Sequence, residues 1–106
     1  MIKARYTTDG NTHNISVKGH ANYADKGRDI VCAGASAVVQ ALIGWIENNP
    51  CEVDYVNIDE NKGEVLVQCY GGEDVKAVFY MTAIGLEQIA NSFPDHVQID
   101  IIGIAD

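Results

Sequence analysis

The residues best suited to chemistry are a histidine and a cysteine, His20 and Cys32, in one short stretch of the chain. His20 follows a segment with the alternation of a strand, and Cys32 begins a very apolar segment with the period of a helix. A cysteine acts as a nucleophile when its thiol is ionised, accessible and close to a base. If Asp29 is the N-cap of that helix, Cys32 lies in the first turn, where unpaired N–H groups and the helix dipole favour a thiolate. The pattern therefore favours the hypothesis of a thiol–imidazole pair.

The place of Cys32 on its helix helps to separate this hypothesis from a packing role. At about 100° per residue, the polar side chains share one arc of roughly 80° that only Ile43 interrupts. These side chains are Asp29, Cys32, Ser36, Gln40 and Glu47. The other residues of 30–46 are apolar or glycine, and we expect them to be buried. Two simpler interpretations stay open, because a polar stripe is often only a solvated face and a free cysteine is often a core residue.

Two blocks around these residues resemble a known family of small single-domain proteases. Gly19-His20-Ala21 comes first, followed by Gly27-x-Asp29-Ile30-Val31-Cys32-Ala33 and then by Ser36. The combined pattern is similar to that of the ribosomal-processing cysteine proteases, the Prp family, and the resemblance spans essentially the whole chain. It implies that Cys32 is the nucleophile and His20 the base. The implied reaction removes a short N-terminal extension from a large-subunit ribosomal protein during ribosome maturation.

The resemblance carries one departure and two further expectations. Relatives tend to have bulkier apolar residues at Gly34-Ala35, so we expect looser packing behind the nucleophile with the catalytic positions intact. The family implies an extended peptide substrate with an aromatic residue before the cut, and a loop that orders around it. It also points to a homodimer. A second long helix supports this, because its non-core face is more apolar than a solvated face should be: it holds Val78, Tyr80, Met81 and Ile84.

Several residues near the pair are candidates for substrate binding or support. Gly19 would allow backbone or substrate to approach closely, although it could simply end a strand. Gly27 is a candidate hinge for the loop 21–28. Tyr23 could line a substrate pocket, but a surface role is the simpler interpretation. Ser36, one turn after the cysteine, could hydrogen-bond the substrate or merely a local carbonyl.

Asp29 has two competing roles. It could orient His20, or it could cap the helix, and both roles need the same oxygens. A carboxylate in this position also opposes formation of a thiolate. The oxyanion formed during the reaction is expected near N–H groups at the start of the helix, including that of Cys32.

Composition and charge limit the class of protein. The 106 residues suffice for one domain, residues 1–106, without metal or disulfide staples. A net charge of −8 and a pI of about 4.6 argue against binding to nucleic acid. The three cysteines and three scattered histidines predict no disulfide framework, metal site or cofactor. The chain start lacks an apolar signal core and the apolar run 30–46 is short for a membrane span, so we expect a cytoplasmic protein with reduced thiols.

Periodicity and turn signals predict the order ββαββαβ. This is an α+β domain with a mainly antiparallel sheet of about five strands and two long helices. Expected strands cover about 2–7, 14–18, 53–58, 65–69 and 97–101, and expected helices cover about 30–48 and 73–93. Cys51 falls in a connection, and Cys69 falls on the apolar side of a strand. Because the first helix is apolar around most of its circumference, we expect it between the sheet and the second helix or a partner subunit.

Two other functions stay open on the sequence alone. The same protease chemistry could act on a phage capsid or scaffold protein, because relatives of the family also appear in phage-like contexts. The chain could instead be a non-enzymatic peptide-binding or assembly module in which Cys32 is inert. An unreactive Cys32 would favour the module, whereas the genomic neighbourhood would separate the two protease hypotheses.

Overall fold

The strand and helix periods of the sequence produce five strands and two helices. The computed structural model describes residues 1–25, 27–49, 53–59 and 62–103, so Cys51 lies outside the described residues. The strands are β1 (Ile2–Asp9), β2 (Thr12–Lys18), β3 (Val53–Asp59), β4 (Glu64–Tyr70) and β5 (Val97–Ile102), and the helices are α1 (Ile30–Asn48) and α2 (Glu73–Ser92). The predicted order ββαββαβ and the α+β class are confirmed.

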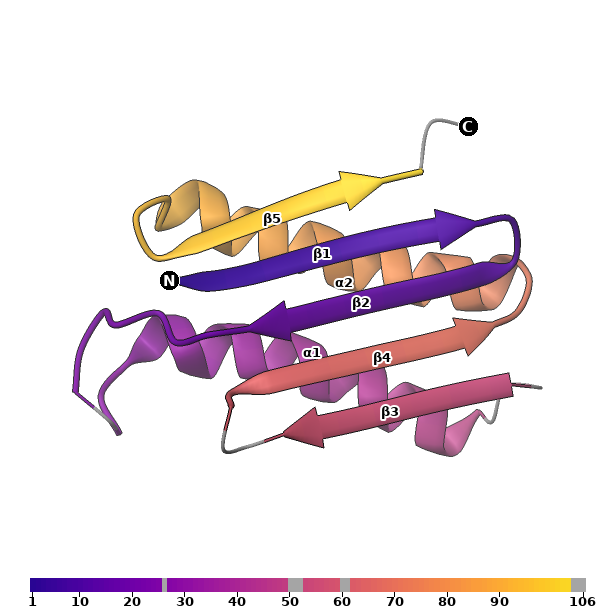
Figure 1. Ribbon diagram of the computed structural model, residues 1–106, viewed down its shortest axis with the longest axis horizontal. Coiled ribbons are helices and arrows are strands. Elements are labelled where there is room, and N and C mark those ends of the chain that lie inside the picture. Colours follow the sequence, from indigo (N-terminus) through magenta and orange to yellow (C-terminus); the bar gives the residue numbers. More distant parts are fainter. Residues whose placement is uncertain (26, 50–52, 60–61, 104–106) are drawn as a thin grey trace.

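The strands form one mixed sheet in the order β3-β4-β2-β1-β5 (Figure 1). As predicted, most pairings are antiparallel, and β5 runs parallel to its neighbour β1. Since β4 and β5 therefore point the same way, the chain between them must cross back over the sheet, and α2 makes that crossing. The crossing brings the segment after α2 next to the start of β1, where the N–H of Ile2 donates to the carbonyl of His96 at 2.9 Å.

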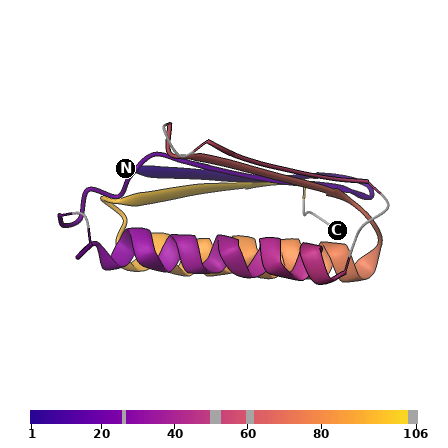
Figure 2. The ribbon, with the colours of Figure 1, turned by 90° about the horizontal axis from the view of Figure 1, so that it is seen from below.

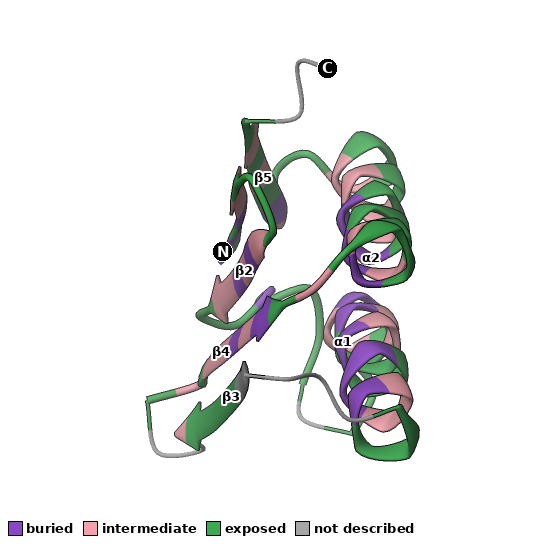
Figure 3. Cartoon of the chain, turned by 90° about the vertical axis from the view of Figure 1, so that its right-hand side faces the viewer, coloured by how far each residue is buried: buried purple, intermediate pink, exposed green. Residues whose placement is uncertain are grey.

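Both helices cover the same face of the sheet and lie side by side in one layer (Figures 2 and 3). The core lies between the layers, where the apolar side of each strand meets the apolar stripe of each helix. Its fully buried residues include Tyr6, Ile15, Val67 and Cys69 from the sheet and Phe79, Ala83 and Leu86 from α2. The predicted core role of Cys69 is thus confirmed.

The prediction that all apolar residues of 30–46 are buried is wrong within the single chain. The sheet-facing residues of α1 are buried, as expected, but Ile30, Ala33 and Ala37 are exposed. The reason is that α2 lies beside α1 and not over it, so the face of α1 away from the sheet is uncovered. By length and composition alone α1 could cross a membrane. Its buried side packs into the core with the sheet and α2, as a core helix does.

A buried histidine, His13 on β2, brings polar contacts into the core. It is 1% exposed, and its Nδ1 lies 3.0 Å from the hydroxyl oxygens of both Tyr6 and Thr8. Burial is the main cause that lowers the pKa of His13; a hydrogen bond with the Gly71 backbone opposes this effect and the charge of Lys76 adds to it. The folded protein therefore holds His13 in its neutral form near neutral pH.

We expect the protein to lose stability as the pH falls below about 6.5, the ordinary pKa of histidine. In that window the unfolded chain protonates His13 while the folded protein does not, so the free energy of unfolding rises with pH by up to about 1.4 kcal/mol per pH unit. A His13→Gln variant lacks this titration and should show a smaller slope. Denaturant unfolding of both proteins between about pH 5 and 7 measures the difference. Equal slopes would contradict a buried neutral histidine.

Candidate active site

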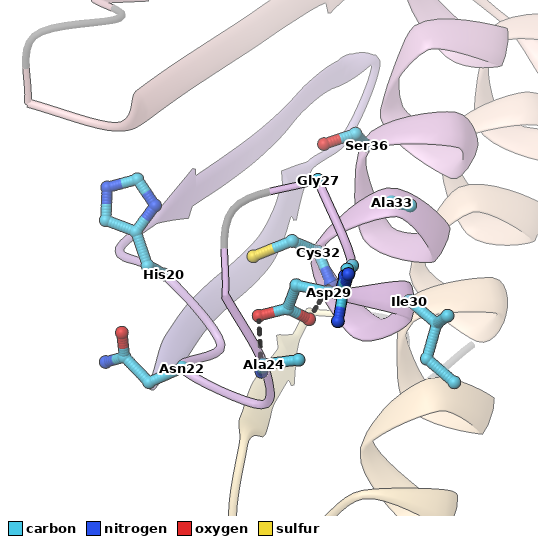
Figure 4. Close-up of a pocket in the computed structure, with 10 residues that line it drawn as sticks. His20, Asn22, Ala24, Gly27, Asp29, Ile30, Cys32, Ala33 and Ser36 are labelled. Atoms are coloured by element: carbon cyan, nitrogen blue, oxygen red, sulfur yellow. Dashed lines mark hydrogen bonds between the residues drawn. The ribbon is translucent and has the colours of Figure 1, made fainter.

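The first turn of α1 is built on Asp29, whose carboxylate accepts four backbone hydrogen bonds. Oδ1 accepts from the N–H groups of Val31 at 3.1 Å and Cys32 at 2.9 Å, which is the predicted N-cap. Oδ2 accepts from the N–H groups of Tyr23 at 3.0 Å and Ala24 at 3.4 Å in the preceding loop. Figure 4 shows the bond from Ala24. The bond from Cys32, then those from Tyr23, Ala24 and Val31, lower the pKa of Asp29, and desolvation opposes them. One carboxylate thus starts the helix and ties the loop to it.

Cys32 projects from this first turn with its thiol partly exposed. Its Sγ accepts a hydrogen bond from the backbone N–H of Ala21 at 3.3 Å, so the segment that follows β2 lies against the sulfur. Figure 4 shows the sulfur pointing away from α1, toward the side on which His20 lies. Ser36, one turn later on α1, is exposed in the same pocket. The polar stripe of α1 therefore opens into a pocket at its N-terminal end.

His20 lies just after β2, and its ring is exposed. The ring lies close to Gly63, in the turn before β4: a Cβ on Gly63 would be 3.1 Å from His20 Nε2. Gly63 also has a φ of +63°, so both its space and its backbone favour glycine. Among the residues that the structure describes, no hydrogen bond links His20 to Cys32, whose sulfur bonds to Ala21 instead.

A pocket of about 650 Å³ joins these groups. Its walls come from the segment after β2 and from the first two turns of α1, and they include His20, Asp29, Cys32, Ser36 and Gly27. A cavity of this size accommodates several side chains of a peptide. The structure therefore brings together the predicted thiol–imidazole pair and three of the predicted supporting residues.

Two predicted site residues, Gly19 and Tyr23, are not among those that line the pocket. Gly19 has a φ of +95°, and a Cβ there would clash with the carbonyl oxygen of Met1, so this glycine allows the end of β2 to pack against the start of the chain. The ring of Tyr23 packs edge-on against Phe93 and His96, with centroids 5.3 Å apart in both pairs. Tyr23 therefore does not line this pocket, which agrees with the simpler interpretation of a surface role, and both residues support the loop.

The bonds around Asp29 favour one of its two competing roles and occupy one of the expected oxyanion donors. Both of its oxygens accept from backbone N–H groups, so Asp29 serves as the helix cap and does not orient His20. The N–H of Cys32, an expected oxyanion donor, already donates to Asp29 Oδ1, and the N–H of Ala33 donates to the Asp29 carbonyl at 3.0 Å. The N–H that faces the sulfur is that of Ala21.

Sequence reasoning overlooked several contacts around the pair, which involve Asn22, Gly63 and His96 from outside the matching motif. Asn22 lines the pocket with a φ of +54°, a backbone conformation that asparagine tolerates better than most residues. Gly63 was recognisable as a turn glycine, but nothing in the sequence places its turn beside His20. Ala21 and His96, which lie 75 positions apart, meet through a hydrogen bond of 2.8 Å that likewise has no local signal.

The departure from the family pattern at Gly34-Ala35 has little effect on packing. Ala35 is 3% exposed and belongs to a core cluster with Val31 and Leu86. A Cβ on Gly34 would meet Ile89 Cδ1 at 3.6 Å, an ordinary contact, so neighbouring α2 already closes most of this space. The expected loosening behind Cys32 is therefore small.

Known proteins match most of this chain. A family model described as cysteine protease Prp matches residues 1–98. The chain belongs to this family. A ribosomal processing cysteine protease Prp from Mycoplasma genitalium is 35% identical over 89 residues, which cover 81% of this chain and 85% of that protein. A Prp of the same description from Staphylococcus aureus is 26% identical over 98 residues, covering 87% and 89% of the two chains.

Solved Prp structures share the fold. The crystal structure of the S. aureus Prp with a covalently linked product peptide has a TM-score of 0.85 at 24% identity, covering 95% of this chain and 99% of that chain. The same protease with a substrate peptide has a TM-score of 0.80 at 23% identity, with the same coverage. The predicted resemblance is confirmed, and the protein is a cysteine protease of the Prp family.

We expect Asp29→Ala and Asp29→Asn to separate the two functions of this carboxylate. Alanine removes all four bonds, so the midpoint of thermal unfolding should fall. Asparagine keeps an oxygen for the N–H groups of Val31 and Cys32 but presents an NH₂ group toward the loop, so it should retain most of the midpoint. Equal unfolding midpoints for the two variants would contradict separate roles of the two Asp29 oxygens in capping α1 and in holding the loop.

The pH dependence of the stability that Asp29 contributes follows from the direction in which its pKa is shifted. Since the pKa of Asp29 is lower in the folded protein, the contribution of its carboxylate is complete above the ordinary value of 3.8. It is lost as the pH falls from there through the lower folded value. The two variants should therefore be compared with the wild type near neutral pH, where the carboxylate contributes fully.

Proposed function

We propose that this protein removes a short N-terminal extension from a large-subunit ribosomal protein, with Cys32 as nucleophile and His20 as general base and acid. The observation that carries the proposal is that Cys32, in the capped first turn of α1, shares one pocket with His20 in a chain of the Prp family. Two relatives bear the name of ribosomal processing proteases. The S. aureus protease binds a substrate peptide in its crystal structure, which supports a peptide as the ligand of this pocket.

The proposed reaction proceeds through a thioester. His20 takes the thiol proton of Cys32, and Sγ attacks the carbonyl carbon of the scissile peptide bond. The positive end of α1 and the N–H of Ala21 favour negative charge on the sulfur and on the oxyanion that forms beside it. As the carbon–nitrogen bond breaks, His20 gives its proton to the leaving amine. His20 then deprotonates a water molecule, which hydrolyses the thioester and restores the thiol.

A bound substrate would bring the His20 imidazole into contact with the Cys32 thiol. In the protein without peptide, His20 is exposed and the Cys32 sulfur accepts a hydrogen bond from the Ala21 N–H. The reaction requires an imidazole in contact with the thiol. Catalytic hydrogen bonds often tighten only when substrate is bound. An extended peptide with an aromatic residue before the cut, as the family resemblance implies, would fill the pocket and shield His20 from water. The thiol would then be its nearest polar partner.

The first test is cleavage of ribosomal proteins that carry their native N-termini. Incubation of purified large-subunit precursors from the source genome, followed by intact-mass measurement, should show that one of them is shortened at its N-terminus. Cys32→Ala and His20→Ala should each lower kcat/KM by about a thousandfold or more, because both groups act in the same chemical steps. Glu47→Ala, at the exposed far end of α1, should leave cleavage unchanged.

If no ribosomal protein is cleaved, the rate of Cys32 alkylation shows whether the assigned catalytic pair or the assigned substrate is wrong. The alkylation is followed by peptide mapping, which reports on each cysteine separately, so the buried Cys69 does not need to be replaced. If Cys32 reacts no faster than a free thiol and His20→Ala has no effect, the assigned pair is wrong. If Cys32 reacts rapidly, His20→Ala slows it and no ribosomal protein is shortened, the protease acts on another protein, such as a phage capsid or scaffold protein.

We propose a cytoplasmic location for this protease. The cytosol keeps thiols reduced, which preserves the nucleophile, and newly made ribosomal proteins are found there. The net charge of −8 is compatible with a basic protein substrate and unfavourable for direct binding to nucleic acid.

We also propose that the protein is a homodimer joined through the outer face of its helical layer. A cavity of about 330 Å³ lies between α1 and α2, and its lining includes Val38, Trp45, Val78 and Met81. Met81 is 68% exposed, and Ile84 on the same helix is 38% exposed. An uncovered apolar surface of this kind marks a protein interface. A second copy related by twofold symmetry would cover it with the same residues.

Met81→Glu should convert the dimer to a monomer, because the interface would bury a carboxylate without a partner. Analytical ultracentrifugation of the variant and the wild type measures this change. Gln98→Glu, which adds the same charge at an exposed position on β5, should leave the dimer intact. A monomeric wild type would refute the homodimer, and a dimeric Met81→Glu variant would refute this interface.

A further inference from the structure

His96 lies in the corner between α2 and β5, outside both the core and the proposed catalytic pair. Backbone hydrogen bonds hold this corner in place. The N–H groups of His96 and Val97 donate to the carbonyl of Phe93 at 2.9 and 3.0 Å, and the N–H of Ile2 donates to the carbonyl of His96 at 2.9 Å. The backbone of His96 is therefore tied to the end of a helix and to the first strand at once.

The His96 side chain reaches from this corner to the segment that carries His20. Its Nδ1 lies 2.8 Å from the carbonyl oxygen of Ala21. Because a carbonyl oxygen only accepts hydrogen bonds, Nδ1 must carry the proton in this contact. Ala21 is 1% exposed, so the bond is made to a residue that is already held between the corner and α1.

The backbone N–H of Ala21 forms a second hydrogen bond, to the proposed nucleophile. Its N–H donates to Cys32 Sγ at 3.3 Å. Two hydrogen bonds thus connect His96 to the sulfur through one residue. Since His20 directly precedes Ala21, the same contacts set the backbone position from which the imidazole projects.

Tyr23 adds a second contact between the corner and this segment. Its ring packs edge-to-face on His96 at 82° and on Phe93 at 79°, geometries that aromatic pairs prefer. The corner therefore holds the segment on both sides of Asn22, the residue with a positive φ.

We propose that His96 is a positioning residue for the protease reaction. Its Nδ1–H holds Ala21 so that the Ala21 N–H faces the Cys32 sulfur and the preceding residue, His20, lies in the same pocket. This inference rests on the catalytic roles proposed above for Cys32 and His20. His96 is not among the residues that line the pocket, so it acts on the reaction through Ala21 and not through the substrate.

Two amide variants distinguish positioning from packing. In His96→Asn the amide nitrogen takes the place of Nδ1 and can still donate to Ala21, whereas in His96→Gln it takes the place of Nε2 and points away from that carbonyl. We expect His96→Gln to lower kcat and the rate of Cys32 alkylation by iodoacetamide roughly tenfold or more, with little change in KM. His96→Asn should keep both rates within about threefold of the wild type.

A core variant controls for general loss of stability. Val67→Ala leaves a cavity in the core cluster around Tyr6 and touches neither Ala21 nor the pocket. At a temperature below the unfolding midpoint of every variant, Val67→Ala should keep the wild-type rate of Cys32 alkylation. If Val67→Ala slows alkylation as much as His96→Gln does, the effect is one of stability and the positioning role is refuted.

The remaining outcomes separate this inference from the proposed function. If both His96 variants keep the wild-type rates while Cys32→Ala abolishes cleavage and His20→Ala slows alkylation, His96 has no positioning role and the protease mechanism stands. If the asparagine and glutamine variants lose the same amount of activity, the ring matters only for packing, which also overturns the proposal. If wild-type Cys32 reacts as an ordinary thiol, the catalytic pair fails and His96 has nothing to position.

Discussion

The capping carboxylate of Asp29 is the interaction on which the site depends. A helix N-terminus leaves backbone N–H groups unpaired, and a carboxylate there both satisfies them and complements the dipole. In this protein the second oxygen extends the cap to Tyr23 and Ala24, so the start of α1 and the preceding loop form one unit. The cap places Cys32 at the pocket but also puts a negative charge near the thiol, which disfavours a thiolate. The Ala21 N–H on the other side of the sulfur offsets part of that effect.

Two distant corners complete the site, and both are consequences of the strand order. Because β4 pairs with β2, the turn before β4 lies beside the end of β2, where the carbonyl of Gly63 accepts from the N–H of Gly19 at 3.0 Å. This places Gly63 close to the His20 ring. Because β5 pairs with β1, the corner after α2 lies beside the start of the sheet, and His96 reaches Ala21. The sheet therefore brings two remote segments to the N-terminal end of α1.

Most of the fold could be read from residue patterns, and α1 shows where such patterns fail. The alternation in β1 and β2 and the 3.6-residue period of α2 already marked one side of each element as apolar, so their bounds agree with the structure to within a few residues. In α1, Ala33 and Ala37 are as apolar as core residues, yet alanine is also common at surfaces. Composition alone could not say that α2 would lie beside α1 and leave this face uncovered.

The sequence by itself indicated Asp29 as a candidate helix cap and, with that cap, placed Cys32 in the first turn, off the core face. It also placed His20 on the same short segment, and these features depend on local geometry, in which capping and helical periodicity act over a few residues. Only the tertiary structure decided that Asp29 is too occupied to orient His20, that the N–H facing the sulfur belongs to Ala21, and that Tyr23 turns toward the α2–β5 corner. Those outcomes depend on residues brought together by strand pairing and side-chain packing, which leave no periodic signal along the chain.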